Sequence, residues 1–198
     1  MELKEKILRR LESVRGEYVS GEQLAGECGV SRNAVWKCIR SLEADGVKLS
    51  SVRNRGYALL AESDALTACG IEKFLHSPFS LQVVKLTGST NDEVKALAEA
   101  GAPAWTAVLA EEQSAGRGRY RRPFDSPAGA GLYLSVLLRP KFSAAETLFV
   151  TACAAVAVCE AIGEVAKKYA EIKWVNDVFL DGKKVCGILT ELLWDGSG

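Results

Sequence analysis

The start of the chain carries apolar side chains every three or four positions, the spacing of one buried face of an α-helix. These side chains are Leu3, Ile7, Leu8, Leu11 and Val14. Ser20 stands three residues before Gln23 in a capping box, which predicts that a second helix begins at Gly21 and ends at Gly29. Ser31 is the expected cap of a third helix that ends near the following Asp-Gly pair.

Three residues of this segment stand where a helix-turn-helix needs them. Ala25 lets two helices approach, Gly29 can adopt a positive φ in the turn, and Val35 packs back onto the core. The segment 47–60 is rich in β-branched and apolar residues and predicts a hairpin with two arginines near its tip. Three helices followed by a basic hairpin form a winged helix.

The rest of the chain alternates short apolar runs with longer helical segments. Strands are predicted at 81–86, 105–111, 131–138, 172–180 and 183–193, and helices at 64–75, from Thr90 onward, and at 144–169. Asp181-Gly182 is a strong signal for a two-residue hairpin turn. The run 131–138 is almost continuously apolar, so we expect this strand to be central or buried on both faces. Small residues in 144–169 suit close packing of this helix against a sheet.

Capping residues mark the expected starts of these helices. Ser63 caps the first, which Pro78 closes, and Ser143 opens the last. Thr90 and Glu93 form a second capping box, which places a Ser-Thr-Asn segment at a helix N-terminus. Hydroxyls, an amide and unpaired backbone N–H groups there can hold a polar ligand, although most such caps are purely structural.

The composition is that of a folded globular protein, with 198 residues of which 48% are hydrophobic and 25% charged, and it excludes disorder, collagen and coiled coils. We expect two domains, a winged helix-turn-helix at 1–62 and a second domain at 63–198, in an α/β (α+β) fold. Residues 1–60 hold 11 basic and 8 acidic side chains, whereas residues 61–198 hold 14 and 17. A basic N-terminal part is a weak indication of a polyanionic partner.

The third helix and the hairpin tip are the candidate DNA interface, because a recognition helix meets the major groove with its first two turns. The candidate DNA-binding residues are Ser31, Arg32, Asn33, Lys37, Arg40, Arg53 and Arg55. Winged helices also serve as protein-interaction modules, and basic residues on an exposed face are often only solvated. Because positive charge gathers on the elements that would touch phosphate, we favour DNA binding over these alternatives.

The location of the protein is predicted from what the chain contains. Its first residues are too charged for a signal peptide. Its longest uncharged apolar run, Thr147 to Cys159, has 13 residues and is shorter than the roughly 20 that span a bilayer. The six cysteines show no CxxC spacing, and His76 is the one histidine. We therefore expect a cytoplasmic protein with reduced, buried thiols, without membrane contact and without histidine-dependent hydrolase chemistry.

The segment 113–127 is the most unusual stretch of the chain. Four arginines share it with two glycines and two prolines, namely Arg117, Arg119, Arg121, Arg122, Gly116, Gly118, Pro123 and Pro127. Glycine lets the backbone approach a ligand, and guanidinium groups suit carboxylate and phosphate oxygens. The segment is neither a Walker loop nor a complete dinucleotide fingerprint. It is either an anion-binding loop or a disordered basic loop.

The predicted C-terminal hairpin carries a second group of polar residues. Lys173, Asn176 and Asp177 precede its turn, and Lys184 and Gly187 follow it. The second domain therefore offers two cationic clusters and one amide–carboxylate pair.

Taken in order, these motifs resemble the biotin protein ligases, in particular the bifunctional type that also represses the biotin operon. The motifs are Gly88-Ser-Thr-Asn, Gln113 with Gly116-Arg-Gly-Arg, Lys173-Trp-Val-Asn-Asp and Lys184-Val-Cys-Gly-Ile-Leu, all behind a winged helix. The resemblance implies a mixed-sheet catalytic domain similar to class II synthetases. It also implies that ATP and biotin give biotinyl-5′-AMP, and that biotin then passes to a lysine of biotin carboxyl carrier protein.

The resemblance implies the following site residues. Biotin would be held by Ser89, Thr90, Asn91, Gln113, Gly116, Arg117, Gly118, Arg119, Lys184, Gly187 and Leu189. ATP would be held by Arg119, Arg122, Asn176, Asp177 and Lys184, with Mg²⁺ accompanying the nucleotide. Arg119 and Lys184 would be catalytic, as electrostatic stabilisers rather than nucleophiles. Operator DNA is the implied second partner, and the adenylate would promote homodimerisation.

The sequence departs from the family pattern at three points. Val175 stands where proline is usual, and Phe124 stands where tryptophan is usual. The chain ends at Gly198, before the further strand, adenylate-binding loop and SH3-like domain of family members. We therefore expect a fragment or a shortened form. A biotin-sensing regulator without transfer activity and a lipoate-activating relative remain as alternatives.

Overall fold

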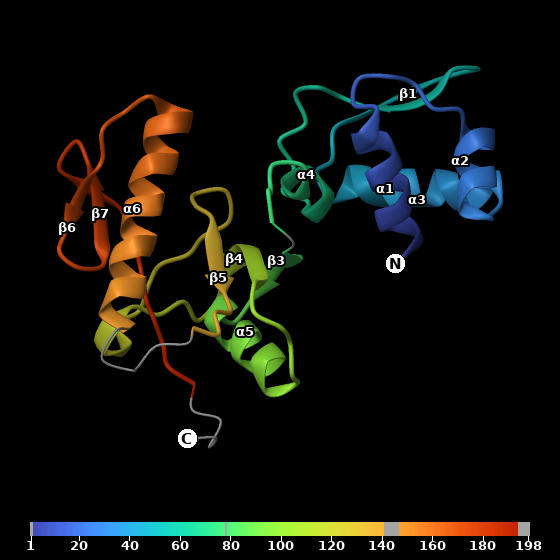
Figure 1. The fold of residues 1–198 in the computed structure, drawn as a ribbon. Coiled ribbons are helices and arrows are strands. Elements are labelled where there is room, and N and C mark those ends of the chain that lie inside the picture. The colour runs from blue at the N-terminus through green and yellow to red at the C-terminus, as the bar shows by residue number, and fades with distance from the viewer. Residues whose placement is uncertain (1, 78, 141–146, 194–198) are drawn as a thin grey trace. The chain divides into compact units, whose positions relative to one another are not determined.

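The computed structural model describes residues 2–77, 79–140 and 147–193. The chain divides into two compact units, Met1–Val83 and Val84–Gly198 (Figure 1).

In the part that the structure describes, the first unit has four helices and a hairpin. The helices are α1 (Leu3–Ser13), α2 (Gly21–Cys28), α3 (Arg32–Ala44) and α4 (Ala68–Glu72), and the strands are β1 (Leu49–Val52) and β2 (Gly56–Leu59). Ile7, Leu11 and Leu24 are fully buried in the core of this unit, together with Val35. The predicted apolar face of the first helix and the predicted core position at Val35 are therefore confirmed.

Side-chain caps fix the start of α2 and of α3, as predicted. The Ser20 hydroxyl accepts a hydrogen bond from the backbone N–H of Gln23, and the Ser31 hydroxyl accepts one from Ala34. Gly29 ends α2 with φ +67°, which confirms the turn glycine. Only half of the expected capping box forms, because the Gln23 side chain donates to Glu27 instead.

The hairpin β1–β2 confirms the predicted wing and pairs antiparallel, with Leu49 opposite Leu59. Val19 forms a bridge to Tyr57 and so ties the hairpin to the chain before α2. Gly56 has φ +108°, and a Cβ atom there would lie 2.1 Å from the Val19 carbonyl oxygen. This position therefore requires glycine on two grounds, backbone conformation and close approach.

The helix predicted at 64–75 is wrong in its start and its cap. α4 begins at Ala68, and its cap is Thr67, whose hydroxyl accepts from the Gly70 N–H. Ser63 is buried, and its hydroxyl accepts instead from the backbone N–H of Lys48, so it fastens the chain after the wing. The expected role of Pro78 lies outside the described residues.

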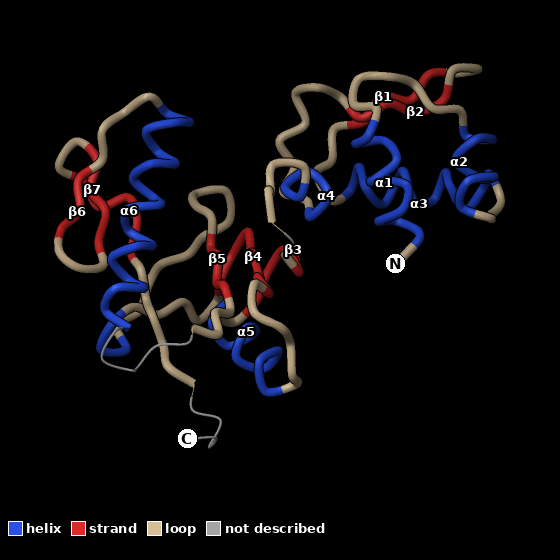
Figure 2. Tube along the Cα trace, in the orientation of Figure 1, coloured by secondary structure: helices blue, strands red, loops and turns tan. Residues whose placement is uncertain are grey.

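The second unit contains two three-stranded sheets and two α-helices, among the residues described. β3 (Ser80–Thr87), β4 (Thr106–Gln113) and β5 (Tyr133–Val136) form one sheet in that order, and β6 (Glu171–Lys173), β7 (Asp177–Leu180) and β8 (Lys183–Gly187) form the other. Helix α5 (Thr90–Glu99) packs against β4 and β5, and α6 (Thr147–Ala166) packs against β6 and β7 (Figure 2). A 3₁₀ turn, η1 (Arg119–Arg121), lies in the segment 113–127, which we call the arginine-rich loop.

The strand predicted at 131–138 is shorter than expected and is not central. β5 lies at the end of its sheet, and Leu134 on it is 55% exposed although Tyr133 and Ser135 are buried. β4 is the central strand, with residues 106–110 all buried. α5 covers one face of β5, so alternate residues of that strand remain open on the other face.

The second capping box does not form. Ser89 is the N-cap residue of α5, and its side chain makes no capping hydrogen bond. The Glu93 carboxylate accepts from the Thr87 hydroxyl at 2.5 Å. Thr90 is the first helical residue and turns its hydroxyl toward β4 and β5.

The C-terminal hairpin confirms the turn at Asp181-Gly182, where φ is +51° and +73°. The single strand expected at 172–180 is instead two antiparallel strands, β6 and β7, joined by a turn. β8 ends at Gly187, before the expected end at 193.

Helix α6 lies against its sheet, as the small residues predicted, with Ala155 buried beside Val178. The expected cap at Ser143 lies outside the described residues. By length and composition alone, Leu148–Ala166 is sufficient to cross a membrane. This helical segment is longer than the uncharged run from Thr147 to Cys159 because it continues past Glu160 and Glu164. The six cysteines are free, and Cys69 is buried but Cys153 is exposed, so the expectation of buried thiols is wrong for Cys153.

Candidate functional site

The N-terminus of α5 is fastened to the end of β4 by one side chain. The Gln113 amide oxygen accepts from the Thr90 backbone N–H at 2.8 Å and from the Thr90 hydroxyl at 3.1 Å. The Gln113 amide nitrogen donates to the Ser126 hydroxyl at 3.0 Å. One glutamine therefore links the helix, the strand and the far end of the arginine-rich loop.

A chain of hydrogen-bonded polar side chains continues from this point. The hydroxyls of Thr90 and Ser135 lie 2.8 Å apart, and the Ser135 hydroxyl also bonds to the Asn91 amide oxygen. The Asn91 amide nitrogen donates to the Glu191 carboxylate at 2.8 Å. Thr90 and Ser135 are 4% and 9% exposed, so the hydroxyl end of this chain is buried, whereas Glu191 at its other end is exposed.

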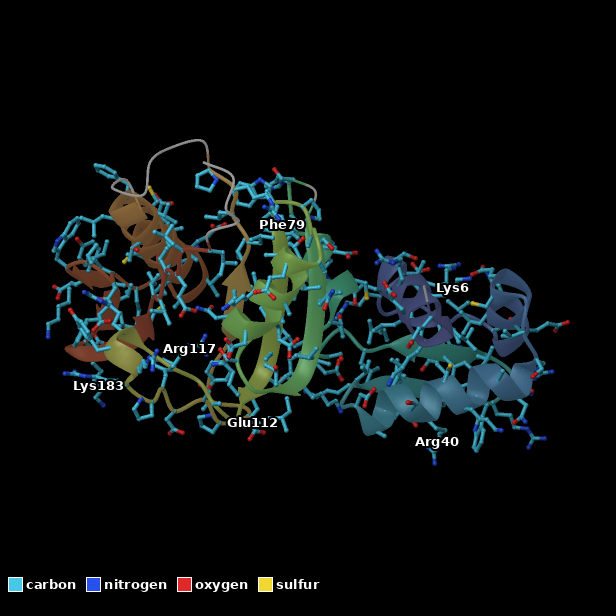
Figure 3. The ribbon with its side chains drawn as sticks, turned by 90° about the horizontal axis from the view of Figure 1, so that it is seen from below. Lys6, Arg40, Phe79, Glu112, Arg117 and Lys183 are labelled. Atoms are coloured by element: carbon cyan, nitrogen blue, oxygen red, sulfur yellow. The ribbon has the colours of Figure 1, made fainter. Side chains whose placement is uncertain are left out.

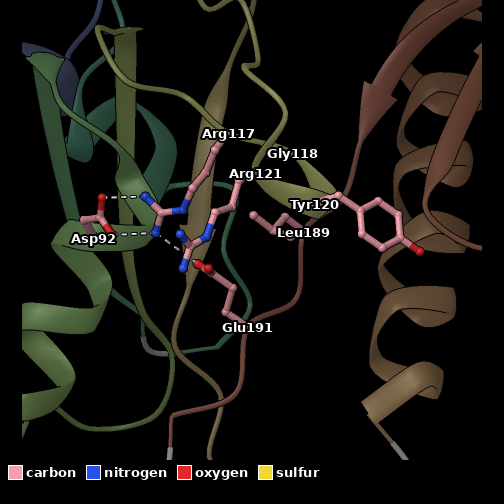
Figure 4. A pocket seen from close by; sticks show the side chains of 7 residues that line it. All are labelled: Asp92, Arg117, Gly118, Tyr120, Arg121, Leu189 and Glu191. Carbon is pink, nitrogen blue, oxygen red and sulfur yellow. Dashed lines mark hydrogen bonds and ion pairs between the residues drawn. The ribbon is translucent and has the colours of Figure 1, made fainter.

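Arg117 forms a bidentate ion pair with Asp92, through N···O distances of 2.6 and 2.5 Å. The same guanidinium lies 3.3 Å from the Glu191 carboxylate (Figure 4). The hydrogen bonds from Arg117 hold the pKa of Asp92 below its ordinary value, and Asp92 in turn raises the pKa of Arg117. The first arginine of the loop is thus anchored to the first turn of α5.

The loop itself is folded back on its own backbone. The Phe124 N–H donates to the Gly116 carbonyl, and the Gly118 N–H donates to the Arg122 carbonyl, both at 2.8 Å. A Cβ atom at Gly116 would lie 2.6 Å from both the Phe124 carbonyl oxygen and the Ser126 hydroxyl. These contacts close the segment between Gly116 and Phe124 into a compact loop.

A second polar group lies on the C-terminal hairpin, and the loop reaches it through Arg119. The Arg119 guanidinium donates to the Asn176 amide oxygen at 2.9 Å. The Asp177 carboxylate accepts from the Asn176 amide at 2.9 Å and from the Lys184 ammonium at 2.8 Å. Gly187 lies beside Lys184, where a Cβ atom would be 3.2 Å from the ammonium nitrogen. Hydrogen bonds therefore join the side chains of one arginine, one amide, one carboxylate and one lysine into a single cluster.

A cavity of about 530 Å³ lies under the loop. Its lining comprises Asp92, Arg117, Gly118, Tyr120, Arg121, Leu189 and Glu191 (Figure 4). The arginine side chains and the two carboxylates make it suited to a ligand that carries both polar and anionic groups.

The structure thus brings most of the predicted site residues into two groups joined by one loop. The first group holds Ser89, Thr90, Asn91, Gln113, Gly116 and Arg117, and the second holds Arg119, Asn176, Asp177, Lys184 and Gly187. Gly118 and Leu189 line the cavity. Arg122 is exposed, and its carbonyl helps to close the loop.

Sequence reasoning missed four residues that the structure places at the site, whereas Arg121, named above among the loop arginines, lines the cavity. The four missed residues are Asp92, Tyr120, Ser135 and Glu191. Asp92 could have been found, because an acidic residue in the first turn of a predicted helix lies near whatever contacts its N-terminus. Glu191 gave no local signal, since it is 99 positions from Asp92 and meets Arg117 only in the folded chain.

The candidate DNA-binding residues lie in the first unit. Arg32, Asn33, Lys37 and Arg40 are all exposed on α3, and Arg40 projects outward from the helix (Figure 3). Arg40 is also 3.0 Å from Glu43. Arg53 and Arg55 are exposed at the hairpin, where the Arg55 guanidinium stacks over the Tyr18 ring at 4.3 Å. The Ser31 hydroxyl is engaged in capping the helix.

Comparison with known proteins identifies the second unit. Residues 83–196 match the model of the biotin/lipoate A/B protein ligase family. The chain belongs to this family. Residues 4–58 match the model of an HTH domain, so the ligase-family segment follows a helix-turn-helix, as the motifs predicted.

Curated relatives combine the same two parts. The chain is 36% identical over 193 residues to the bifunctional ligase/repressor BirA of Bacillus subtilis, covering 96% of this chain and 59% of the relative. It is 35% identical over 181 residues to BirA of Escherichia coli, covering 89% of this chain and 54% of the relative. The chain thus spans less than two thirds of the length of these relatives.

Solved structures of biotin protein ligases share the fold. The Leishmania major enzyme in complex with biotin matches with a TM-score of 0.54 and 29% identity, over 60% of this chain and 54% of that chain. A mutant of the Aquifex aeolicus enzyme in complex with biotin matches with a TM-score of 0.51 and 37% identity, over 59% and 48%. The predicted ligase fold behind a winged helix-turn-helix is confirmed.

Proposed function

We propose that this chain carries the catalytic centre of an ATP-dependent biotin–protein ligase, at 63–198, and a DNA-binding domain of a biotin-responsive repressor, at 1–62. The observation that carries the proposal is the arginine-rich loop. Arg117 anchors it at the N-terminus of α5, and Arg119 reaches the hairpin that holds Asp177 and Lys184. The family indicates the type of reaction. The contacts of the loop explain how the N-terminus of α5 and the C-terminal hairpin, which are far apart in the sequence, can act together.

The first reaction joins two anions. The carboxylate oxygen of biotin attacks the α-phosphorus of ATP, the bond to the bridging oxygen of the β-phosphate breaks, and pyrophosphate leaves with biotinyl-5′-AMP remaining. Repulsion and misalignment of the two anions form most of the barrier, so fixed cations beside the phosphorus lower it. Arg119 and Lys184 are the groups that would do this, because the Lys184 ammonium and Arg119 meet at the Asn176–Asp177 pair.

Biotin would lie against the first group, where Gln113 and Thr90 hold the end of α5 rigid. The hydroxyls and the Asn91 amide offer donors and acceptors for a ureido ring. Arg117 and Gly118 would face the carboxylate end. The nucleotide would lie toward Arg122, Asn176 and Asp177.

Mg²⁺ fits the second group as an ion that arrives with ATP. Asp177 provides a carboxylate and Asn176 an amide oxygen, and Mg²⁺ is commonly held by one or two carboxylates together with substrate phosphates and water. The ion would neutralise phosphate charge while Asp177 orients it.

In the second reaction, the amine of an acceptor lysine attacks the acyl carbon of the adenylate, AMP leaves, and the amine loses a proton. The acceptor proposed is the biotin carboxyl carrier protein. Adenylate-loaded chains are proposed to dimerise and to bind operator DNA in the cytoplasm, which links ligand state to repression.

The test is incubation of the purified chain with ATP, labelled biotin and an isolated carrier domain. Release of pyrophosphate and labelling of the carrier lysine support the ligase. Adenylate without labelling identifies a sensor that has lost transfer, and calorimetry with biotin against lipoate separates the two substrates. Absence of adenylate from a folded, soluble sample contradicts the proposal.

A further inference from the structure

Helix α3 carries an aromatic ring within its basic face. Arg32, Trp36 and Arg40 are spaced four residues apart, so their side chains form one row along the helix. Trp36 is 50% exposed, and Arg32 and Arg40 are exposed as well. An indole ring therefore lies between two guanidinium groups on an open face.

The core does not account for this ring. Val35, Ile39 and Leu42 fill the interior from a neighbouring face of α3, with exposures of 0%, 1% and 2%. Trp36 is not one of the partly buried apolar residues that pack against that core. Half of a large apolar surface is left in water at the face that carries the positive charge.

We propose that Trp36 reads DNA sequence by packing its indole ring against the 5-methyl group of thymine in the major groove. This inference rests on the proposed DNA binding of the first unit. The thymine methyl is the apolar feature that the major groove presents, and apolar side chains recognise it by contact. The flanking arginines are suited to the phosphates on either side, so they position the ring without reading sequence.

Charge supports double-stranded DNA as the occupant of this face. Lys37 adds a further exposed cation to α3, and Arg53 and Arg55 add two more at the wing. Arg40 is paired with Glu43 at a surface where the pair is weak, so a phosphate can compete for the guanidinium.

The experiment uses the full chain with biotin and ATP, and a duplex selected from a random library by that chain. Each thymine is replaced in turn by deoxyuridine, which removes only the methyl group. For the parent, we expect deoxyuridine at one thymine of each half-site to lower the affinity about fourfold, which corresponds to the loss of one buried methyl group. Trp36→Ala is expected to bind the thymine duplex about tenfold more weakly and to show no further loss with deoxyuridine.

Two further variants make the test specific. Trp36→Phe keeps an apolar ring and loses the indole N–H, so it should retain the preference for thymine. Arg40→Ala should weaken binding to the thymine and deoxyuridine duplexes equally, as a phosphate contact does. Circular dichroism checks that α3 is intact in each variant.

Three outcomes overturn the inference while DNA binding itself stands. They are unchanged affinity in Trp36→Ala, an equal loss in the Phe and Ala variants, and a preference for thymine that survives in Trp36→Ala. Failure of the parent chain to bind any selected duplex is a different result, because it removes the proposed DNA-binding function as well.

Discussion

The Arg117 guanidinium and the Asp92 carboxylate meet through two parallel hydrogen bonds of 2.6 and 2.5 Å. Asp92 lies in the first turn of α5, so this pair fixes the start of the arginine-rich loop to the helix whose N-terminus holds the proposed biotin site. A bidentate pair restricts orientation as well as distance. The pair thus fixes the orientation of the loop at this point.

This pair predicts a titration. The hydrogen bonds from Arg117 place the pKa of Asp92 below its ordinary value of 3.8. A lowered pKa in the folded state stabilises the fold above the ordinary value, and this contribution is lost as the pH falls through the folded-state pKa. Carboxyl chemical shifts followed by NMR should show this, and Arg117→Met should return the Asp92 pKa toward 3.8. An unchanged midpoint in the variant would contradict the pairing.

Lys184→Met should lower the rate of adenylate formation by about 10²–10³, the usual effect of removing one charge-stabilising donor. The Lys184 ammonium lies 2.8 Å from the Asp177 carboxylate, and the residue before it on β8, Lys183, is an exposed lysine of the same charge. Lys183→Met is therefore the matched control and should keep the parent rate. Pyrophosphate release in a single turnover measures both, and equal rates in the two variants would argue against an electrostatic role for Lys184.

Gly116→Ala should destabilise the loop, because its Cβ would lie 2.6 Å from the Phe124 carbonyl oxygen, which is backbone and cannot swing aside. We expect a loss of roughly 1–3 kcal/mol, the usual cost of forcing atoms into a packed site. In Gly163→Ala the new Cβ meets nothing closer than 3.7 Å, and this variant should fold as the parent does. Denaturant unfolding of both proteins checks the difference, and equal stabilities would show that the loop relaxes freely.

Glu12 predicts a stability effect in the first unit. Its nearly buried carboxylate accepts from Arg15 at 2.8 Å and from Lys73 at 2.6 Å, which joins α1 to the residue after α4. Burial alone would raise the Glu12 pKa, but the hydrogen bonds from these two cations lower it overall.

Glu12→Gln should cost about 1–3 kcal/mol in the free energy of unfolding, because it leaves both cations without their charge partner. Glu5→Gln is the control, since the Glu5 side chain is 44% exposed and pairs with Arg9 at 3.2 Å. Calorimetric unfolding should separate the two variants. A Glu12→Gln protein as stable as the control would show that the network is not stabilising.

Local chemistry explains which elements could be predicted. Ser20, Gly29 and Ser31 act within four residues of their own position, so the sequence alone specified the ends of α2 and the start of α3. Ser63 could not be predicted in the same way. Its hydroxyl is engaged by Lys48, 15 positions earlier, which no local pattern records.

The candidate site shows the same limit. Glycines and arginines in sequence indicated an anion-binding loop, but not which carboxylates would hold it. Arg117 meets Glu191 across 74 positions and Arg119 meets Asn176 across 57, and both contacts depend on how the two sheets fold. The apolar run around Leu134 predicted a strand that is central or buried on both faces, but Leu134 is 55% exposed. An apolar sequence alone does not say whether a second layer covers the strand.

The most direct test of the central claim is single-turnover formation of biotinyl-5′-AMP from biotin and ATP, followed by mass spectrometry, in the parent chain and in Arg119→Ala. If the loop brings the two groups to one phosphorus, the parent forms the adenylate and the variant forms it at least 10²-fold more slowly. Equal rates in the two proteins, or no adenylate from a folded parent, would contradict the account.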